Sequence, residues 1–327
     1  MATEISPGNA KGWRAASPSV SLPEIYASIP VPHSARFWKK MFAFAGPGYL
    51  VAVGYMDPGN WATDLAGGAR YGYTLLSVIL ISNVMAIVLQ ALAARLGIAS
   101  GRDLAQACRD SYSKPVTISL WLLCEIAIAA CDLAEVIGSA IALNLLFGLS
   151  LVWGVCLTAL DVLVILFLQH RGFRYVEALF VGLIMMIAGS FAVELLLSCP
   201  ELTGVAAGFV PHLEIMRNGN MLYIAIGILG ATVMPHNLYL HSSIVQTRKY
   251  TDTIESRREA IRFSTIDSSF ALMFALFINA AILVMAAATF HGTGNEQVAE
   301  IGDAYQLLSP LLGTTMASIL FAVALLC

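Results

Sequence analysis

The sequence predicts an all-α, polytopic membrane protein. Of its 327 residues, 58% are hydrophobic and only 12% are charged, whereas a soluble domain carries about 25% charged residues. The apolar residues gather in long stretches, each able or nearly able to cross roughly 30 Å of hydrocarbon. Two stretches are interrupted by short proline-containing motifs, DPGN at Asp57–Asn60 and MPHN at Met234–Asn237. This pattern excludes a soluble protein and favours a membrane transporter.

Eight apolar segments follow a polar N-terminal region. Residues 1–40 are rich in Pro and Ser and lack the apolar core and cleavage site of a signal peptide, so we predict a disordered cytoplasmic tail. The segments are residues 41–71, 73–98, 115–147, 151–169, 175–198, 221–247, 263–290 and 305–327. The first and the sixth contain the two interruptions.

The positions of the basic residues predict the orientation. With the N-terminus in the cytoplasm, every Lys and Arg except Arg70 and Arg217 falls in the tail or near the loops after segments 2, 4 and 6. Cytoplasmic loops are enriched in Lys and Arg, so this distribution supports both the segment count and a cytoplasmic N-terminus in the cell membrane. Residues 199–220 then form an extracellular loop.

The two interruptions suggest an internal repeat. If segment 6 begins a second copy of segment 1, the repeat unit has five helices, and an odd number inserts the second copy upside down. We therefore expect a first repeat at 41–198 and the start of an inverted repeat at 221–327. The sequence ends inside an apolar run, so we expect a fragment with an incomplete second repeat; a complete eight-helix protein is the alternative.

The residues at the interruptions predict an ion-binding site. Lipid cannot hydrogen-bond the backbone that a broken helix frees, so such breaks line cavities or sites. The Asp57 carboxylate is costly at membrane depth, Asn60 can face the same point, and Gly54 can expose its carbonyl, as can Ala231. Met234 alone would be a core side chain, but a thioether beside oxygen donors favours transition ions over Mg²⁺ and Ca²⁺.

Groups that could carry protons accompany this site. Histidine exchanges protons near neutral pH, so we favour a proton role for His236, with structural and ligand roles as alternatives. In segment 3, Glu125, Asp132 and Glu135 share one face of the predicted helix. Such a stripe suits a proton route, although the acids could instead pair with neighbouring helices. We expect structural or rim roles for the other polar residues of the spans: Gln90, Asp161, Glu177, Glu194, His241 and Asp267.

Three motifs resemble the NRAMP family of divalent-metal transporters, most closely its bacterial manganese branch. They are GPGYLVAVGYMDPGNWATDLAGG at Gly46–Gly68, DLAEVIG at Asp132–Gly138 and GATVMPHNLYLHS at Gly230–Ser242. The resemblance extends from about Arg36 to Cys327 and implies a LeuT-like fold with eleven or twelve helices in the family. It also implies proton-coupled uptake of Mn²⁺ and Fe²⁺ by alternating access.

The resemblance also implies roles for individual residues. Asp57, Asn60 and Met234 match the side-chain metal ligands, together with the carbonyls of Gly54 and Ala231. The proton route is implied at Asp132, Glu135 and His236. The expected partners are divalent metal ions, protons and the lipid bilayer, with no cofactor, nucleic acid or obligate protein partner.

Two other functions compete with metal transport. An amino-acid or amine symporter could use the same fold, because the N-termini of half-helices suit a substrate carboxylate, but Asp57 would repel that group. An intramembrane metalloenzyme is disfavoured, because the two histidines at 236 and 241 do not form an HExxH motif and no water-activating ligand set with a base is visible. We therefore predict a transporter and not an enzyme.

Overall fold

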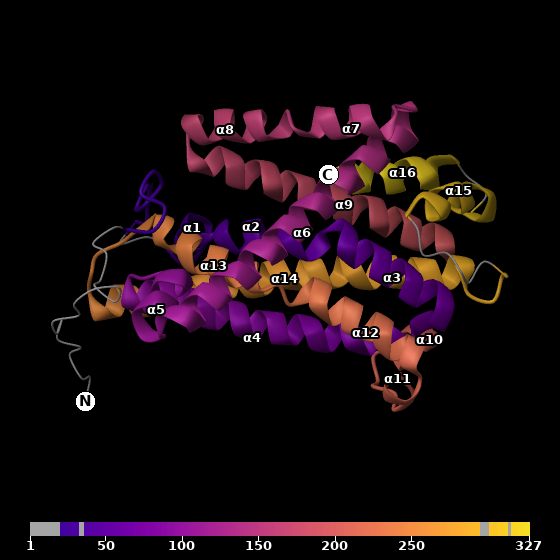
Figure 1. Cartoon of the computed structure of the whole chain (residues 1–327), viewed down its shortest axis with the longest axis horizontal. Coiled ribbons are helices and arrows are strands. Elements are labelled where there is room, and N and C mark those ends of the chain that lie inside the picture. The colour runs from indigo at the N-terminus through magenta and orange to yellow at the C-terminus, as the bar shows by residue number, and fades with distance from the viewer. Residues whose placement is uncertain (1–19, 33–35, 295–300, 313–314) are drawn as a thin grey trace.

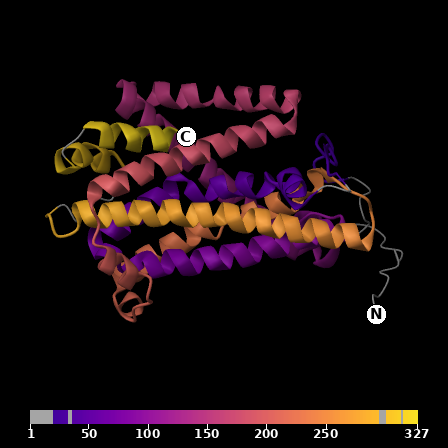
Figure 2. The same cartoon turned by 180° about the vertical axis from the view of Figure 1, so that it is seen from behind.

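Helices lie roughly along the long axis of the molecule and form nearly all of its regular structure (Figures 1 and 2). The computed structural model describes residues 20–32, 36–294, 301–312 and 315–327. The α-helices are α1 (Phe37–Phe44), α2 (Pro47–Val53), α3 (Pro58–Tyr71), α4 (Leu76–Ser100), α5 (Leu104–Ser111), α6 (Lys114–Phe147), α7 (Leu151–Thr158), α8 (Asp161–Arg171), α9 (Phe173–Ser198), α10 (Leu202–Gly208), α11 (Glu214–Arg217), α12 (Gly219–Thr232), α13 (Pro235–Ile244), α14 (Ile254–Phe290), α15 (Ile301–Leu312) and α16 (Thr315–Leu326). The 3₁₀-helices are η2 (Gly54–Met56), η3 (Gly72–Leu75) and η4 (Val245–Thr247), and the strands are β1 (Ile29–Pro30) and β2 (Arg248–Lys249).

Six helical stretches of the described residues are long and apolar enough to cross a membrane. They are α3 with α4, α6, α7 with α8, α9, α12 with α13, and α14. The first stretch, Pro58–Ser100, is a hairpin and not one span: the turn at Gly72 lies beside His291 at one end of α14, whereas the carbonyl of Ala99 accepts a hydrogen bond from Arg257 at the other end. The predicted all-α membrane architecture is confirmed.

The long helix α14 forms the centre of the bundle and packs against α2, α3, α4 and α9. Glycines allow the closest of these approaches. A Cβ atom at Gly48 would lie 2.6 Å from the backbone of Ser268, and one at Gly68 would overlap the carbonyl oxygen of Leu283. Small residues at helix contacts are typical of membrane bundles, because lipid provides no hydrophobic drive and close backbone packing must provide the attraction.

The helices α7 and α8 lie at the edge of the bundle (Figure 1). Only 6% of the most apolar stretch of these two helices is buried inside the protein. Large apolar side chains such as Val152, Trp153 and Phe167 are exposed. In lipid this exposure is expected, since the hydrocarbon is as apolar as a protein core. The same bilayer explains why so apolar a helix pair needs no protein cover.

The N-terminal region differs from the disordered tail that the sequence predicts. Within residues 20–32, β1 pairs in parallel with β2, with Ile29 opposite Arg248. Ile29 is buried, and the amide of Ala27 donates to the carbonyl of Gln246. The expectation of disorder is therefore wrong for this part, because backbone pairing with the segment after α13 orders it. Residues 1–19 lie outside the described residues.

The predicted span at 305–327 also differs from the structure. It contains two helices of 12 residues each, α15 and α16, which pack against each other. The hydroxyl of Ser318 donates to the carbonyl of Tyr305 at 2.7 Å, a contact that one continuous helix could not make, because thirteen residues of helix extend about 20 Å. Pro310 and Gly313, both poor helix formers, fall near the end of α15.

Candidate functional site

The first interruption forms where α2 and η2 give way to α3. Asp57 has an extended backbone with φ −70° and ψ 165°, and its carboxylate accepts a hydrogen bond from the amide of Asn60 at 2.9 Å. Pro58 occupies the first position of α3, where its fixed φ suits a helix start and its missing N–H costs nothing. The DPGN motif thus ends one half-helix and caps the next.

The second interruption separates α12 from α13. Val233, with φ −98° and ψ 79°, and Met234, with φ −90° and ψ 117°, leave the helical conformation, and Pro235 then begins α13. Met234 is buried, with 5% of its surface exposed. Its thioether therefore sits inside the bundle at the point where the backbone is unwound.

The two interruptions face each other. The side-chain amide of Asn60 donates to Asp57 at 2.6 Å and to the carbonyl of Ala231 at 3.1 Å. From the second interruption, the amide of Asn237 donates to the sulfur of Met234 at 3.7 Å, and a Cβ atom at Gly54 would overlap that same amide. The structure thus brings together the residues that the sequence predicts as ligands, which are Gly54, Asp57, Asn60, Ala231 and Met234.

The donor set suits a divalent ion of intermediate softness. It offers one carboxylate, amide and carbonyl oxygens and one thioether, a combination that favours transition metals over Mg²⁺ or Ca²⁺. Among the described residues, no group of three or more His, Cys, Asp and Glu side chains could hold a metal. A cation at the interruptions would therefore rely on Asp57 for charge and on neutral donors for the rest, displacing the Asp57–Asn60 hydrogen bond.

Asn237 is a site residue that the sequence analysis gave no role. It is buried and contacts both Met234 and the Gly54 position. A signal was present: Asn237 follows Met234 by three residues, just as Asn60 follows Asp57. Both asparagines occupy the third position of a half-helix that begins with proline, so each reaches back to the residue before that proline.

A chain of buried polar groups lies beside the site. The amide of Gln90 donates to the hydroxyl of Tyr55 at 2.9 Å, and its oxygen lies 2.9 Å from Nδ1 of His241. Gln90 and His241 are completely buried and Tyr55 nearly so. This chain links η2, α4 and α13, in keeping with the structural roles expected for Gln90 and His241.

A buried ionic network holds the junction between α1 and α2. Arg248 is 1% exposed and donates to Glu177 at 2.7 Å. Its other nitrogens donate to the carbonyls of Ala43 at 3.1 Å, Phe44 at 3.2 Å and Ala45 at 2.8 Å. Burial lowers the pKa of the Arg248 guanidinium, and the nearby Glu177 opposes that change. These bonds satisfy carbonyls that the end of α1 leaves free.

Asp267 fixes the start of α2 on the other side of the same junction. Its carboxylate accepts hydrogen bonds from the amides of Gly48 at 2.7 Å and Gly46 at 3.3 Å. Free N–H groups at a helix N-terminus attract a carboxylate, both by hydrogen bonding and through the helix dipole. These contacts are consistent with the structural roles expected for Glu177 and Asp267, and they position the half-helix that leads to Asp57.

The acids of α6 lie on a different surface. Glu125, Asp132 and Glu135 are exposed on the described chain, and Glu125 accepts a hydrogen bond from Trp121 at 2.9 Å. Asp132 is close enough to His236 for an electrostatic interaction, whereas Nδ1 of His236 has no hydrogen-bond partner among the described residues. This leaves the stripe facing outward, with Asp132 as the member that interacts with His236, and the proton route stays a prediction.

Comparison with known proteins identifies the family. Residues 48–327 match the family model described as Nramp, natural resistance-associated macrophage protein-like. The chain belongs to the Nramp family. Two curated Nramp relatives are divalent metal cation transporters named MntH. The one from Nostoc sp. is 67% identical over 306 residues, covering 94% of this chain and 69% of the relative. The one from Listeria innocua is 60% identical over 326 residues, covering 100% and 73%.

A solved Nramp structure supports the same fold. The crystal structure of the Eremococcus coleocola manganese transporter, in complex with an aromatic bis-isothiourea substituted compound, superposes with a TM-score of 0.86 at 43% identity. The match covers 94% of this chain and 66% of that transporter. The predicted LeuT-like architecture and family are thereby confirmed, and this chain spans about two thirds of the length of its solved relative.

Proposed function

We propose that the chain imports divalent transition metal ions, Mn²⁺ and Fe²⁺, together with protons and by alternating access. The observation that carries this proposal is the meeting of the two interruptions, where Asn60 bridges Asp57 and Ala231. Asp57, Asn60 and Met234 bind the ion through side chains, and Gly54 and Ala231 through carbonyls. The names of the MntH relatives and of the manganese transporter support the class of substrate.

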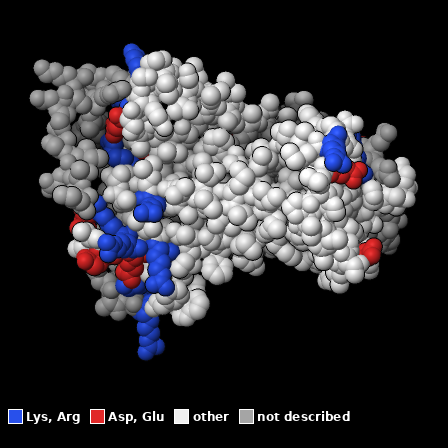
Figure 3. Space-filling view, turned by 90° about the horizontal axis from the view of Figure 1, so that it is seen from below, with Lys and Arg blue, Asp and Glu red and all other residues white. Residues whose placement is uncertain are grey.

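The proposal includes a topology in the cell membrane. The N-terminus is cytoplasmic, residues 41–198 form the first repeat, 199–220 an extracellular loop, and 221–327 part of the inverted repeat. Basic residues gather at the end of the molecule that holds α1 and α5, and few lie at the opposite end (Figure 3). The positive-inside rule places such an end in the cytoplasm.

Metal binding by the purified chain tests the site. Mn²⁺ would be titrated in detergent and the free ion followed by its electron paramagnetic resonance signal. We expect saturable binding that Asp57→Asn abolishes, because the carboxylate at the interruptions is then lost. Asp303→Asn is the matched control, since Asp303 lies on α15 and its side chain is exposed. Unchanged affinity in Asp57→Asn would contradict the assignment.

Proton movement is tested separately. Asp132→Asn and Glu135→Gln would be reconstituted in vesicles that contain a pH-sensitive dye. We expect both to reduce the acidification that accompanies Mn²⁺ entry, with His236→Ala acting in the same direction. Acidification equal to that of the unaltered chain in all three variants would sink the assignment of Asp132, Glu135 and His236 to a proton route, which also includes Glu125.

The amino-acid symporter is the weaker candidate. A substrate carboxylate would meet the Asp57 side chain, which caps α3 and holds the charge of the site. The same titration distinguishes the two functions, because leucine or glycine should leave the Mn²⁺ signal unchanged. Competition by an amino acid at its own saturable site would favour the symporter instead.

A further inference from the structure

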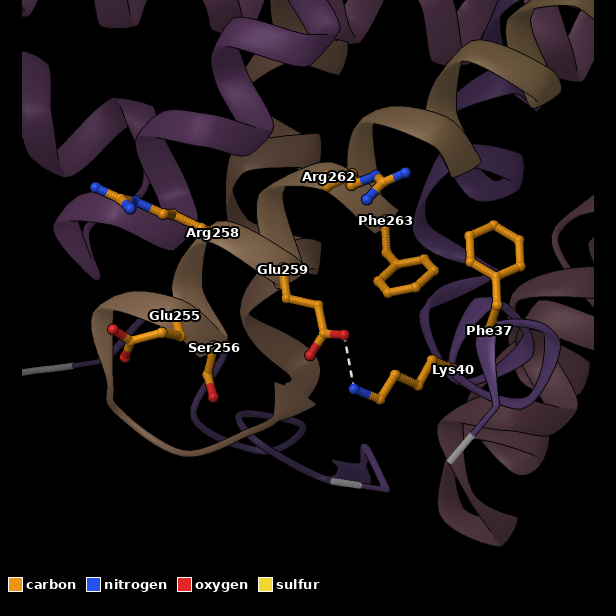
Figure 4. A pocket seen from close by; sticks show the side chains of 8 residues that line it. All are labelled: Phe37, Lys40, Glu255, Ser256, Arg258, Glu259, Arg262 and Phe263. Atoms are coloured by element: carbon orange, nitrogen blue, oxygen red, sulfur yellow. Dashed lines mark hydrogen bonds and ion pairs between the residues drawn. The ribbon is translucent and has the colours of Figure 1, made fainter. Parts of the chain in front are cut away.

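A charged pocket lies at the basic end of the molecule, between α1 and the first turns of α14. Its volume is about 650 Å³, and Figure 4 shows its walls. Phe37 and Phe263 form one wall, with ring centroids 5.3 Å apart. The Lys40 ammonium and Glu259 carboxylate form another, 2.6 Å apart. Arg262 extends above Phe263 (Figure 4).

The pocket lies beside the part of α14 that extends beyond the hydrocarbon. With 37 residues, α14 is about 55 Å long, whereas about 20 residues suffice to cross the hydrocarbon. The charged first turns of α14 therefore extend beyond the hydrocarbon. On α1, Trp38 and Phe42 are exposed beside Lys39, the combination of aromatic and basic residues that sits at a membrane interface.

The charges of the pocket favour an anion. Three cationic side chains line it, and two acids oppose them, Glu255 and Glu259. Lys40 is engaged by Glu259, but within the described part of the chain neither Arg258 nor Arg262 forms an ion pair. An unpaired guanidinium binds phosphate oxygens through two parallel N–H groups. In Figure 4 Arg258 points to the far side of α14, which leaves Arg262 as the guanidinium nearest Phe263.

We propose that this pocket binds the headgroup of an anionic phospholipid. Arg262 holds the phosphate, the Lys40–Glu259 ion pair borders it, and the Phe37–Phe263 wall receives the start of the acyl chains. A free phosphate could bind Arg262 through the same charge interaction, but it has no apolar part that could pack against the Phe37–Phe263 wall. Because the lipid contacts both α1 and α14, its binding ties α1 to the central helix of the bundle.

Native mass spectrometry tests the proposal. Dioleoyl phosphatidylglycerol would be titrated into the chain in a neutral detergent, and the first bound lipid counted. We expect one saturable site that Arg262→Gln weakens about tenfold, the effect of one charge-assisted hydrogen bond. Lys39→Gln removes the same charge from the neighbouring exposed surface and should change the affinity by less than about twofold.

Glu259→Gln gives a prediction of opposite sign. It removes the acid that neutralises Lys40, so we expect phosphatidylglycerol to bind about fivefold more tightly, the effect of about one cation near a membrane surface. Circular dichroism would check that both substitutions leave the helices intact; each changes a side chain with solvent access, so folding should be retained.

Three outcomes would overturn the proposal. Equal weakening by Arg262→Gln and Lys39→Gln would mean that only general surface charge attracts the lipid. Equal binding of dioleoyl phosphatidylcholine would mean that the acyl chains alone are recognised. Full displacement of the lipid by millimolar glycerol phosphate would identify a site for a free phosphate and not for a membrane lipid.

Discussion

Replacing Arg248 with methionine tests whether the buried ionic network stabilises the junction of α1 and α2. Arg248 and Glu177 are both almost fully buried, at 1% and 3% side-chain exposure. Breaking a buried ion pair costs about 3–5 kcal/mol, because the remaining charge is left uncompensated. Arg174 still pairs with Glu177 at 3.1 Å, so we expect the lower value, about 3 kcal/mol.

The expected loss is measurable as a change in thermal stability. The unfolding entropy is about 2.1 cal/mol/K per residue, and the chain has 327 residues. Dividing about 3 kcal/mol by the total entropy gives an expected fall in Tm of about 4 °C. The assay is thermal unfolding of the purified chain in detergent, followed by tryptophan fluorescence. Arg257→Met is the matched control, because its pair with Asp252 has side chains that are 42% and 77% exposed and should be worth less than about 1 kcal/mol.

A double variant separates the ion pair from simple loss of packing. Arg248→Met with Glu177→Gln removes the uncompensated charge as well, so it should be more stable than Arg248→Met alone. A fall in Tm for Arg248→Met no larger than that for Arg257→Met would contradict a stabilising role of the buried pair. Simple additivity of the changes at Arg248 and Glu177 would contradict it as well.

Three further predictions concern selectivity, packing and thiol reactivity. Met234→Ala should lower the ratio of Mn²⁺ to Ca²⁺ affinity at least about tenfold, measured by calorimetry of both ions; an unchanged ratio would remove the thioether from the selectivity argument. Gly97→Ala should destabilise the chain by about 1–3 kcal/mol, because its Cβ would overlap the carbonyl of Ser242, whereas Gly182→Ala meets nothing within 4 Å and should leave Tm unchanged or higher. Burial raises the pKa of Cys108, an effect that a hydrogen bond from Tyr239 reduces, and the thiolate is the reactive form. In a variant that keeps only this cysteine, alkylation by iodoacetamide should therefore reach half its maximal rate at a higher pH than for free cysteine, and an equal midpoint would contradict this.

The fold followed from features that act locally in the sequence. Long apolar runs predict helices, because a spanning segment in lipid must satisfy its backbone hydrogen bonds internally. Pro58 and Pro235 set where two of the half-helices begin. The end of the chain was less predictable. At 305–327 hydropathy alone suggested one span, but the contact between Tyr305 and Ser318 depends on how two helices pack, which no local pattern encodes.

The candidate site shows the same division. The positions of Asp57 and Met234 beside prolines predicted which residues lie at the interruptions, because helix capping is a local property. That Asn60 reaches Ala231 could not be derived from either segment, since it requires both half-helices to be placed in the bundle. The order of β1 was missed for a related reason: Ile29 pairs with Arg248, more than two hundred residues away.

The continuous helix α14 also sets a fixed length for the interrupted segment beside it. Gly48 of α2 fits against Ser268, and Gly68 of α3 fits against Leu283. One extra residue in α14 between these contacts would advance the rest of the helix by about 1.5 Å and rotate it by about a third of a turn. Both glycines could then no longer meet their partners at once. Insertions and deletions should therefore be excluded from α14 between Ser268 and Leu283. The unwound residues between α2 and α3 differ in this respect, because irregular backbone can accommodate an insertion of its own.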